Sequence, residues 1–159
     1  MTDLPKHQQD LTAEERWPDD DIWLDDEVDE FYDEYGFRKS TRPYNEQQTQ
    51  RCLADIADKA LKAAMIVAEG RANFMAHNYE GSKRRDSAER TIEVIAEAGA
   101  RLHSDYKLTK PDIPWREFYG MRSKISHGYD SVDYDMVWET ISKDIPKLAQ
   151  DLGLDISQY

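Results

Sequence analysis

The apolar residues between positions 46 and 152 recur at the spacing of helices. In residues 46–69 they fall every three or four positions, among residue types that favour helices. These apolar residues are Leu53, Ile56, Ala57, Ala60, Ala64 and Val67. No stretch alternates between apolar and polar residues as a strand would. The pattern therefore predicts an all-α fold.

Glycine and proline divide the rest of the chain into further segments. A short helical turn is expected at 71–78, after a glycine that interrupts the first helix. Residues 79–82 are predicted to form a loop, in which Ser82 is the N-cap of a helix that runs to about residue 104. The segment 105–114 contains two prolines and is predicted to be a connection.

Two more helices are predicted near the C-terminus. One begins near Pro114 and reaches about Ser126, because proline is favoured in the first turn of a helix. The other covers about 132–152, and Pro146 should kink or restart it. We therefore predict an up-down bundle of four main helices, joined by short loops.

The N-terminal segment differs from the bundle in its charge. Residues 1–36 hold 14 of the 33 acidic residues and 2 of the 21 basic ones, which accounts for the whole net charge of −12. Residues 37–159 hold 19 of each and can still present a local basic face. The chain is thus divided into an acidic arm (1–44), a helical domain (45–152) and a short tail (153–159).

Aromatic residues are interleaved with the acids of the arm. Leu24, Val28, Phe31 and Tyr35 are spaced by four, three and four positions, which predicts a short amphipathic helix at about 21–35. Three interpretations of the arm stay open. It is a solubilising extension, a nucleic-acid mimic that lies in a cleft of the bundle, or a handle for a partner protein.

Cysteine content and hydropathy indicate the cellular compartment in which the protein is expected. Cys52 is the single cysteine, so no intrachain disulfide can form, and a reducing compartment is the simplest expectation. The N-terminus lacks a signal pattern, and no apolar run approaches the roughly 18 residues that a membrane helix needs. We expect a cytoplasmic protein with no membrane association.

The sharpest local feature is the sequence Arg122-Ser-Lys-Ile-Ser-His127-Gly-Tyr129. Positions five apart point to different sides of an unbroken helix. If the helix ends near Ser126, His127 can turn back toward Arg122, and Tyr129 can reach the rim of the same pocket. Histidine exchanges protons near neutral pH, and arginine offers a charged fork to phosphate oxygens. The trio therefore suits cleavage of RNA through its 2′-OH without a metal. A helix-terminal histidine favoured by the helix dipole is the plainer alternative.

The segment Ile113-Pro-Trp-Arg-Glu-Phe-Tyr-Gly-Met-Arg-Ser-Lys-Ile-Ser-His-Gly-Tyr129 resembles the signature of the HepT-like HEPN proteins. Their motif is R-x(4–6)-H, commonly extended to R-x4-H-x-Y. The resemblance covers roughly residues 50–152. It continues in Ile92–Ala98, Val132-Asp133, Val137–Thr140 and Asp144–Leu148.

This resemblance implies a function and a set of partners. HepT-like proteins are dimeric helical bundles whose two motifs face each other across a cleft. They act as metal-independent endoribonucleases, usually as toxins, and use no cofactor. Their antitoxin is commonly a nucleotidyltransferase of the MNT type, which in some pairs transfers AMP to the motif tyrosine. The resemblance thus implies that Arg122 and His127 are catalytic, and that Tyr129 supports the site and is the candidate AMP acceptor.

Two positions depart from the usual motif. Ser123 replaces an Asn or other polar residue after the arginine, and Asp130 replaces a Phe after the tyrosine. Asp130 would bring negative charge near the phosphate. Both departures are expected to affect the rate of cleavage while leaving the trio in place.

Four basic residues are candidate RNA contacts, namely Lys83, Arg84, Arg85 and Lys124. Their alternative role is that of a solvated helix face. Glu97 lies among apolar residues and is predicted either to be a buried partner for an arginine or to form a dimer contact. We predict an endoribonuclease toxin that is a homodimer. The alternatives are a non-catalytic HEPN module that binds RNA or a nucleotidyltransferase, and an adaptor whose arm recruits a basic partner.

Overall fold

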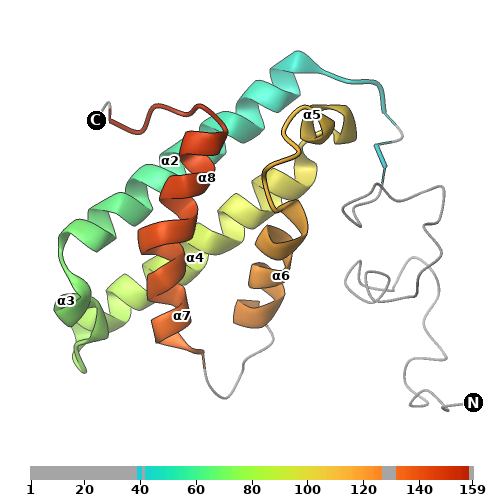
Figure 1. The fold of residues 1–159 in the computed structure, drawn as a ribbon. Helices are drawn as coiled ribbons and strands as arrows, with labels where there is room; N and C mark the ends of the chain where they lie inside the picture. The colour runs from blue at the N-terminus through green and yellow to red at the C-terminus, as the bar shows by residue number, and fades with distance from the viewer. Residues whose placement is uncertain (1–38, 41, 127–131, 158–159) are drawn as a thin grey trace, which may run out of the picture.

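The computed structural model describes residues 39–40, 42–126 and 132–157, and only the backbone of 121–126. Figure 1 shows the helices that these residues form. They are α2 (Glu46–Ala68), α3 (Arg71–Met75), α4 (Tyr79–Arg101), α5 (Ser104–Leu108), α6 (Trp115–Ser126), α7 (Tyr134–Glu139), the π-helix η2 (Thr140–Asp144) and α8 (Ile145–Asp151). The described residues contain no strand, which confirms the all-α class. The helix predicted at 21–35 lies outside the described residues.

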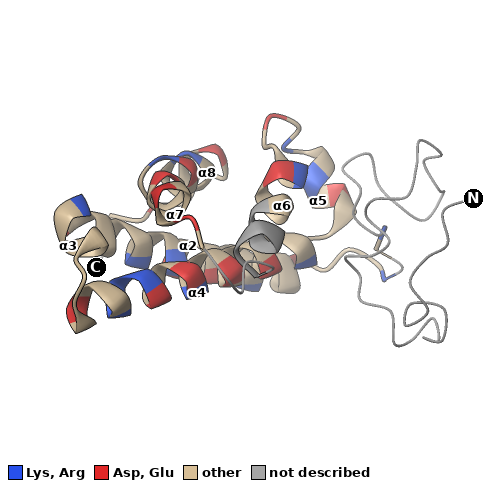
Figure 2. Cartoon of the chain, turned by 90° about the horizontal axis from the view of Figure 1, so that it is seen from below, with Lys and Arg blue, Asp and Glu red and all other residues tan. Residues whose placement is uncertain are grey.

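The two long helices, α2 and α4, lie side by side and form one layer (Figures 1 and 2). The second layer consists of α6 and of the continuous run α7–η2–α8. In this second layer α6 packs on α4, and α8 packs on α2. Each predicted main helix therefore corresponds to a helical segment of the described residues.

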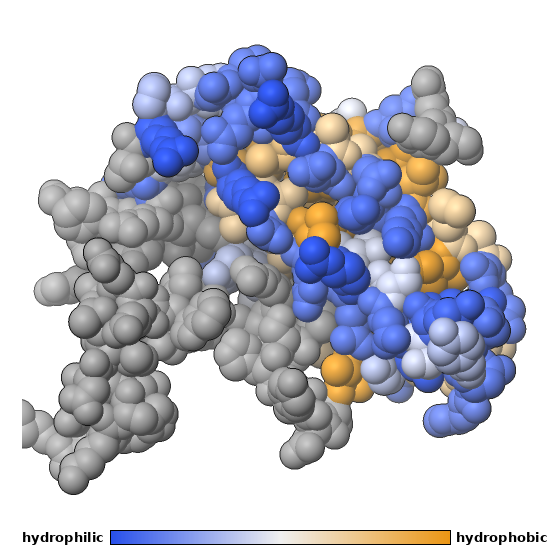
Figure 3. Space-filling model, turned by 180° about the vertical axis from the view of Figure 1, so that it is seen from behind, coloured by the Kyte–Doolittle hydropathy of each residue, from blue (hydrophilic) through white to orange (hydrophobic). Residues whose placement is uncertain are grey.

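The outer surface is mainly hydrophilic where the structure describes it. Figure 3 shows polar and charged side chains over most of the described part of one face, with smaller apolar areas between them. Among the large apolar residues that are exposed, Met65 and Tyr79 are the most accessible, at 63% and 76%. Isolated exposed apolar residues of this kind are normal on a protein surface.

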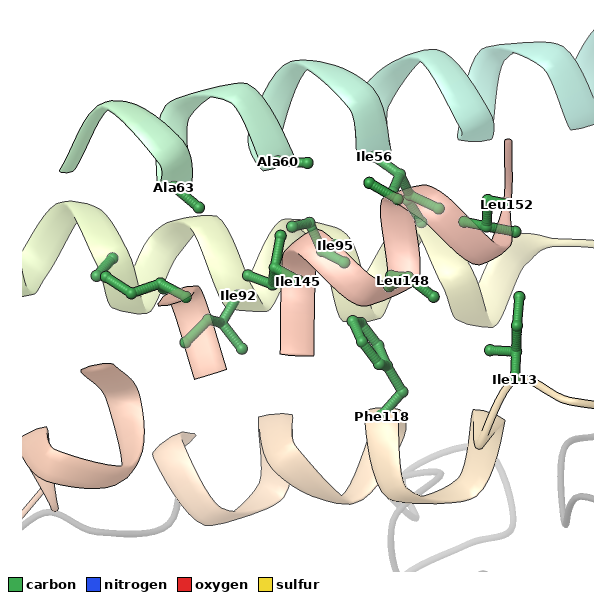
Figure 4. Close-up of a cluster of buried hydrophobic side chains, with 14 of the residues drawn as sticks. Ile56, Ala60, Ala63, Ile92, Ile95, Ile113, Phe118, Ile145, Leu148 and Leu152 are labelled. Atoms are coloured by element: carbon green, nitrogen blue, oxygen red, sulfur yellow. The ribbon is translucent and has the colours of Figure 1, made fainter. Parts of the chain in front are cut away.

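The core lies between the two layers. Figure 4 shows isoleucines, alanines and leucines from α2, α4 and α8 meeting Phe118 of α6. Ala60 and Ala63 are almost fully buried, and their small side chains let α2 approach α4 closely. Ala63 and Ile66 are buried, whereas the predicted core positions Ala57, Ala64 and Val67 are partly exposed. The buried stripe is thus rotated slightly from the predicted one.

The predicted loop at 79–82 is wrong, because α4 already begins at Tyr79. Asn78 is its N-cap, and the Asn78 side-chain oxygen accepts a hydrogen bond of 2.8 Å from the Gly81 amide. Ser82, the predicted N-cap, lies inside the helix. Gly81 is present for a steric reason: a Cβ added there would lie 2.1 Å from the Ala76 carbonyl oxygen. Glycine here permits close packing of two segments and does not mark a loop.

The segment 105–114 is not purely a connection, because α5 occupies its first part. α4 ends at Arg101 rather than near 104, and His103 caps α5 by accepting a hydrogen bond of 3.1 Å from the Asp105 amide. Lys107 of α5 is 2% exposed, and its Nζ donates to the Ala100 carbonyl oxygen at 3.3 Å. This buried lysine thus provides a hydrogen bond to a carbonyl oxygen at the C-terminal end of α4.

Pro146 restarts the last helix, as the sequence predicted. It lies in the first turn of α8, directly after the π-helical turn of η2. There the Ile145 amide donates to the Thr140 carbonyl, five residues earlier. Proline has no N–H and its ring clashes with the carbonyl four residues before it. The wider π turn leaves room for the proline ring and does not need its N–H, so the helical run continues without a break.

Candidate active site

The Arg-His-Tyr motif connects the end of α6 to the start of α7. Arg122, Ser123 and Lys124 belong to α6 by their backbone, and their side chains lie outside the description. His127, Tyr129 and Asp130 lie outside the described residues altogether. The structure therefore locates the end of α6 and the start of α7, which flank residues 127–131, and both lie at the same end of the bundle (Figure 1).

Two buried aromatic residues fix α6 on the bundle. Trp115 is 2% exposed, and its Nε1–H donates to the Lys110 carbonyl at 3.2 Å. Phe118, one turn later, is also buried in the core. Gly99 of α4 faces the Trp115 ring. A Cβ added at Gly99 would lie 3.9 Å from that ring. Arg122 follows Phe118 by four residues, about one turn of the same anchored helix.

The other end of the motif segment is held by an N-cap. The Asp133 carboxylate accepts hydrogen bonds from the Asp135 and Met136 amides, at 3.0 and 3.1 Å. The next residue, Tyr134, packs its ring edge-on against Phe74, with centroids 6.3 Å apart. An ion pair between Arg71 and Asp135 adds a further link between α3 and α7.

Tyr134 also contacts two charged residues of α4. The Arg85 guanidinium lies over the Tyr134 ring, 5.1 Å from its centroid, and the Tyr134 hydroxyl is hydrogen-bonded to Glu89. Burial raises the pKa of Tyr134, and the bond to Glu89 raises it further, so the hydroxyl stays protonated and donates. Burial raises the pKa of Glu89, and the hydrogen bond from Tyr134 offsets only part of this rise. We call Arg85, Glu89 and Tyr134 the α7 anchor.

The predicted RNA contacts of α4 have different surroundings. Arg85 donates to the Phe74 and Ala76 carbonyl oxygens, at 2.8 and 3.0 Å, and so holds the α3–α4 turn. Arg84 is ion-paired with Glu69, and its side chain is 23% exposed. Lys83 is exposed, pairs with Glu80 and lies over the Tyr79 ring. Figure 2 shows acidic and basic residues alternating along α4, so its surface charge is mixed.

The sequence alone did not reveal the α7 anchor as part of the site. Its pattern places Arg85 on a basic face, and Glu89 belongs to no motif. The available signal was Tyr134 itself, an aromatic residue directly after an Asp that can cap a helix. Glu97 pairs with Arg101, but its side chain is 41% exposed, so it is not the buried partner that one of the two predicted roles described. Trp115 is a core residue.

The described residues give two further observations. They contain no group of three or more His, Cys, Asp or Glu side chains placed to hold a metal ion. No helix in the described part of the chain is long and apolar enough to cross a membrane. Cys52 is buried, and burial raises the pKa of its thiol, so it is a poor nucleophile.

Comparison with known proteins identifies the class. The model of the Ribonuclease HepT-like family matches residues 58–153, which include the whole motif. The chain belongs to the HepT-like ribonuclease family, as the resemblance of its motif predicted. No solved structure gives a significant match.

Relatives with assigned names agree with this family. A Thermococcus cleftensis protein named "Probable ribonuclease HepT" is 44% identical over 59 residues, which cover 37% of this chain and 54% of the relative. A Methanocaldococcus jannaschii protein named "Putative RNase MJ1380" is 32% identical over 65 residues, 41% of this chain and 60% of the relative. The chain thus spans between about half and three fifths of the length of these relatives.

Proposed function

We propose that the protein is a metal-independent endoribonuclease that cleaves RNA with Arg122 and His127. The observation that carries this proposal is the family match over 58–153, because it includes the complete Arg-x4-His-x-Tyr sequence. The names of the relatives support an RNA substrate. The N-cap of α7 and the packing of α6 support a site that lies between two fixed helix ends.

The proposed reaction needs only the residues of the motif. His127 takes the proton of an RNA 2′-OH, and the 2′ oxygen forms a bond to the adjacent phosphorus. The bond from phosphorus to the 5′ oxygen breaks, and as this oxygen leaves it takes up the proton that His127 has accepted. A 2′,3′-cyclic phosphate remains on the other fragment. Arg122 stabilises the charge that builds up on the phosphate oxygens in the transition state.

The role in the cell is proposed on the same basis. The protein acts as the toxin of a toxin–antitoxin pair and works as a homodimer in which two motifs share one cleft. Its antitoxin is a nucleotidyltransferase of the MNT type. Tyr129 supports the site and is the acceptor of AMP when the antitoxin silences it. Lys83, Arg84, Arg85 and Lys124 are the proposed RNA contacts, and Lys83 is the most exposed of those whose side chains are described.

Induced expression tests this proposal. The wild type should arrest growth and fragment cellular RNA, whereas Arg122→Ala and His127→Ala should do neither. Loss of one such transition-state donor typically lowers the rate by roughly 10²–10³-fold. Arg116→Ala is the matched control, because it removes an exposed arginine from the same helix outside the motif. His77→Ala removes an exposed histidine in the same way.

The alternative function is a binding module without catalysis. It predicts that all four variants and the wild type leave RNA intact, while the purified protein still binds RNA or a nucleotidyltransferase. Normal growth and intact RNA with every variant and with the wild type, at equal protein levels, would contradict the endoribonuclease proposal.

A further inference from the structure

A cavity of about 360 Å³ lies where α2 begins and α4 ends. Its walls come from residues 39–49 and from the corner between α4 and α5. In Figure 1 this corner is at the opposite end of the bundle from the ends of α6 and α7 that flank the motif. The cavity is therefore a separate feature from the candidate active site, and nothing in the proposed reaction uses it.

The side chains around this cavity are cationic. Lys39, Arg42 and Arg101 line it, together with amide and hydroxyl groups from Asn45, Gln48 and Thr49. None of the described residues that line it is acidic. Of the carboxylates that the structure describes, Glu97 pairs with Arg101, and none pairs with Lys39 or Arg42. Three basic side chains thus line one hollow in a protein whose total charge is strongly negative.

The segment that carries Lys39 and Arg42 is tied to the bundle. The His103 Nε2–H donates to the Arg42 carbonyl oxygen at 2.9 Å, while His103 Nδ1 accepts from the Asp105 amide. The Ser104 amide donates to the Ser40 hydroxyl at 3.4 Å. The Tyr44 ring meets His103 edge-on at 5.6 Å. These contacts hold the two cations of the segment at the same cavity that Arg101 lines from the end of α4.

The nearby acids that the structure describes are engaged elsewhere. Glu46 accepts hydrogen bonds from the Tyr44 hydroxyl and from Gln50, and it does not line the cavity. Asp105 lies on α5, beside His103 and outside the lining. The described wall of the cavity therefore presents donors and positive charge without a competing carboxylate.

We propose that this cavity binds a phosphate group, either of an RNA strand or of a free nucleotide. An arginine fork matches phosphate oxygens, and a lysine adds a point charge. The amide and hydroxyl groups of the wall can hydrogen-bond the remaining oxygens or an attached sugar. The volume lies in the roughly 300–1,000 Å³ range of small-molecule sites, so it accommodates more than an inorganic ion.

Equilibrium binding to the full-length protein tests the proposal. The RNA probe is a labelled 2′-O-methyl oligouridylate, which keeps the phosphates but lacks the 2′-OH, so cleavage does not enter. The nucleotide probe is ATP. The double variant Lys39→Ala with Arg42→Ala should weaken binding of the recognised probe about tenfold or more. If the probe is the RNA, the slope of log affinity against log salt should fall by about 1.4, because each of the two cations accounts for roughly 0.7.

The matched control is Lys143→Ala with Lys147→Ala, which makes the same change in charge on exposed lysines of η2 and α8. Weakening by the cavity variant alone supports the proposal. Weakening of the RNA probe alone identifies a strand, and weakening of ATP binding identifies a nucleotide. Equal weakening by the control pair, or no binding of either probe to the wild type at low salt, overturns the assignment.

A second variant tests the site in the opposite direction. Glu97→Gln removes the carboxylate that pairs with Arg101 and leaves the residues of the cavity wall unchanged. Arg101 is then available to the phosphate, and the affinity for the recognised probe should rise several-fold. Glu139→Gln, which releases the exposed Lys143 of η2, should not have this effect. A Glu97→Gln protein that folds normally and binds no more tightly contradicts the proposed role of Arg101.

Discussion

At the scale of single residues, the α7 anchor places an ionisable side chain, Glu89, beside the start of α7, which follows the motif. Glu89 on α4 is hydrogen-bonded to Tyr134, the first residue of α7, and burial raises the Glu89 pKa. The folded protein therefore disfavours the charged form of Glu89. As the pH rises above about 4.3, the ordinary pKa of this side chain, ionisation of Glu89 costs the folded state stability.

Glu89→Gln should remove this dependence, because the amide oxygen can still accept the Tyr134 hydrogen bond without a charge. The free energy of unfolding of the variant, relative to the wild type, should increase as the pH rises from about 4.5 to 7. Urea denaturation at several pH values measures it. Glu117→Gln, which changes an exposed carboxylate of α6 outside the anchor, is the control. If the difference in the free energy of unfolding between Glu89→Gln and the wild type is constant with pH, or decreases as the pH rises, the folded protein does not disfavour the charged form of Glu89.

The roles of individual residues were only partly predictable. The residue types at Arg122, His127 and Tyr129 indicate a chemistry without a structure. Arginine supplies a fixed positive charge, and histidine accepts and donates protons near neutral pH. The α7 anchor was not predictable, since Glu89 and Tyr134 are distant in sequence and their contact depends on how α4 and α7 cross. Cys52, in contrast, lies among the apolar residues of the first predicted helix, and it is buried in the structure, where burial raises the pKa of its thiol.

At the scale of elements, helical periodicity predicted the helices well and their beginnings less well. The bounds of α2 and α6 agree with the predicted ones within about one residue. The start of α4 was predicted wrongly because glycine is common in loops and also where two backbones meet. α5 was missed because it is short and begins with a histidine cap, which is not among the usual capping residues.

Gly81→Ala tests the steric account of the α3–α4 turn. A methyl group there meets the Ala76 carbonyl oxygen at 2.1 Å, so the turn must shift. We expect a loss of about 1–3 kcal/mol in the free energy of unfolding, the usual cost of overpacking. Gly120→Ala in α6 is the matched control, because nothing lies within 4 Å of its added Cβ.

The control should gain about 0.5–1 kcal/mol, because alanine favours helix over glycine. Urea denaturation with both variants gives the comparison. Similar changes in stability for Gly81→Ala and Gly120→Ala would show that Gly81 is not required for close packing.

At the scale of the whole molecule, charge is the main organising feature. The net charge of −12 lies in residues 1–36, whereas the cationic cavity begins at Lys39. If the arm is a nucleic-acid mimic, its removal should raise RNA cleavage. A deletion of residues 1–40 would also remove Lys39 and Ser40, which line the cavity, so a deletion of residues 1–36 is the cleaner variant.

At low salt the shortened protein should cleave RNA faster than the full chain. The difference between the two rates should shrink as salt is added, because salt screens the attraction of the acidic arm for a basic cleft. Initial rates on one RNA at a series of salt concentrations provide the measurement. Equal rates for the two proteins at low salt would leave the arm as a solubilising extension or a partner handle.

The central claim is that Arg122 and His127 cleave RNA without a metal ion. The most direct test incubates purified wild type, Arg122→Ala, His127→Ala and Arg116→Ala with RNA in excess EDTA and identifies the new 3′ ends. We expect 2′,3′-cyclic phosphate ends from the wild type and from Arg116→Ala, and intact RNA with the two motif variants. Cleavage that EDTA abolishes, or that persists in His127→Ala, would contradict it.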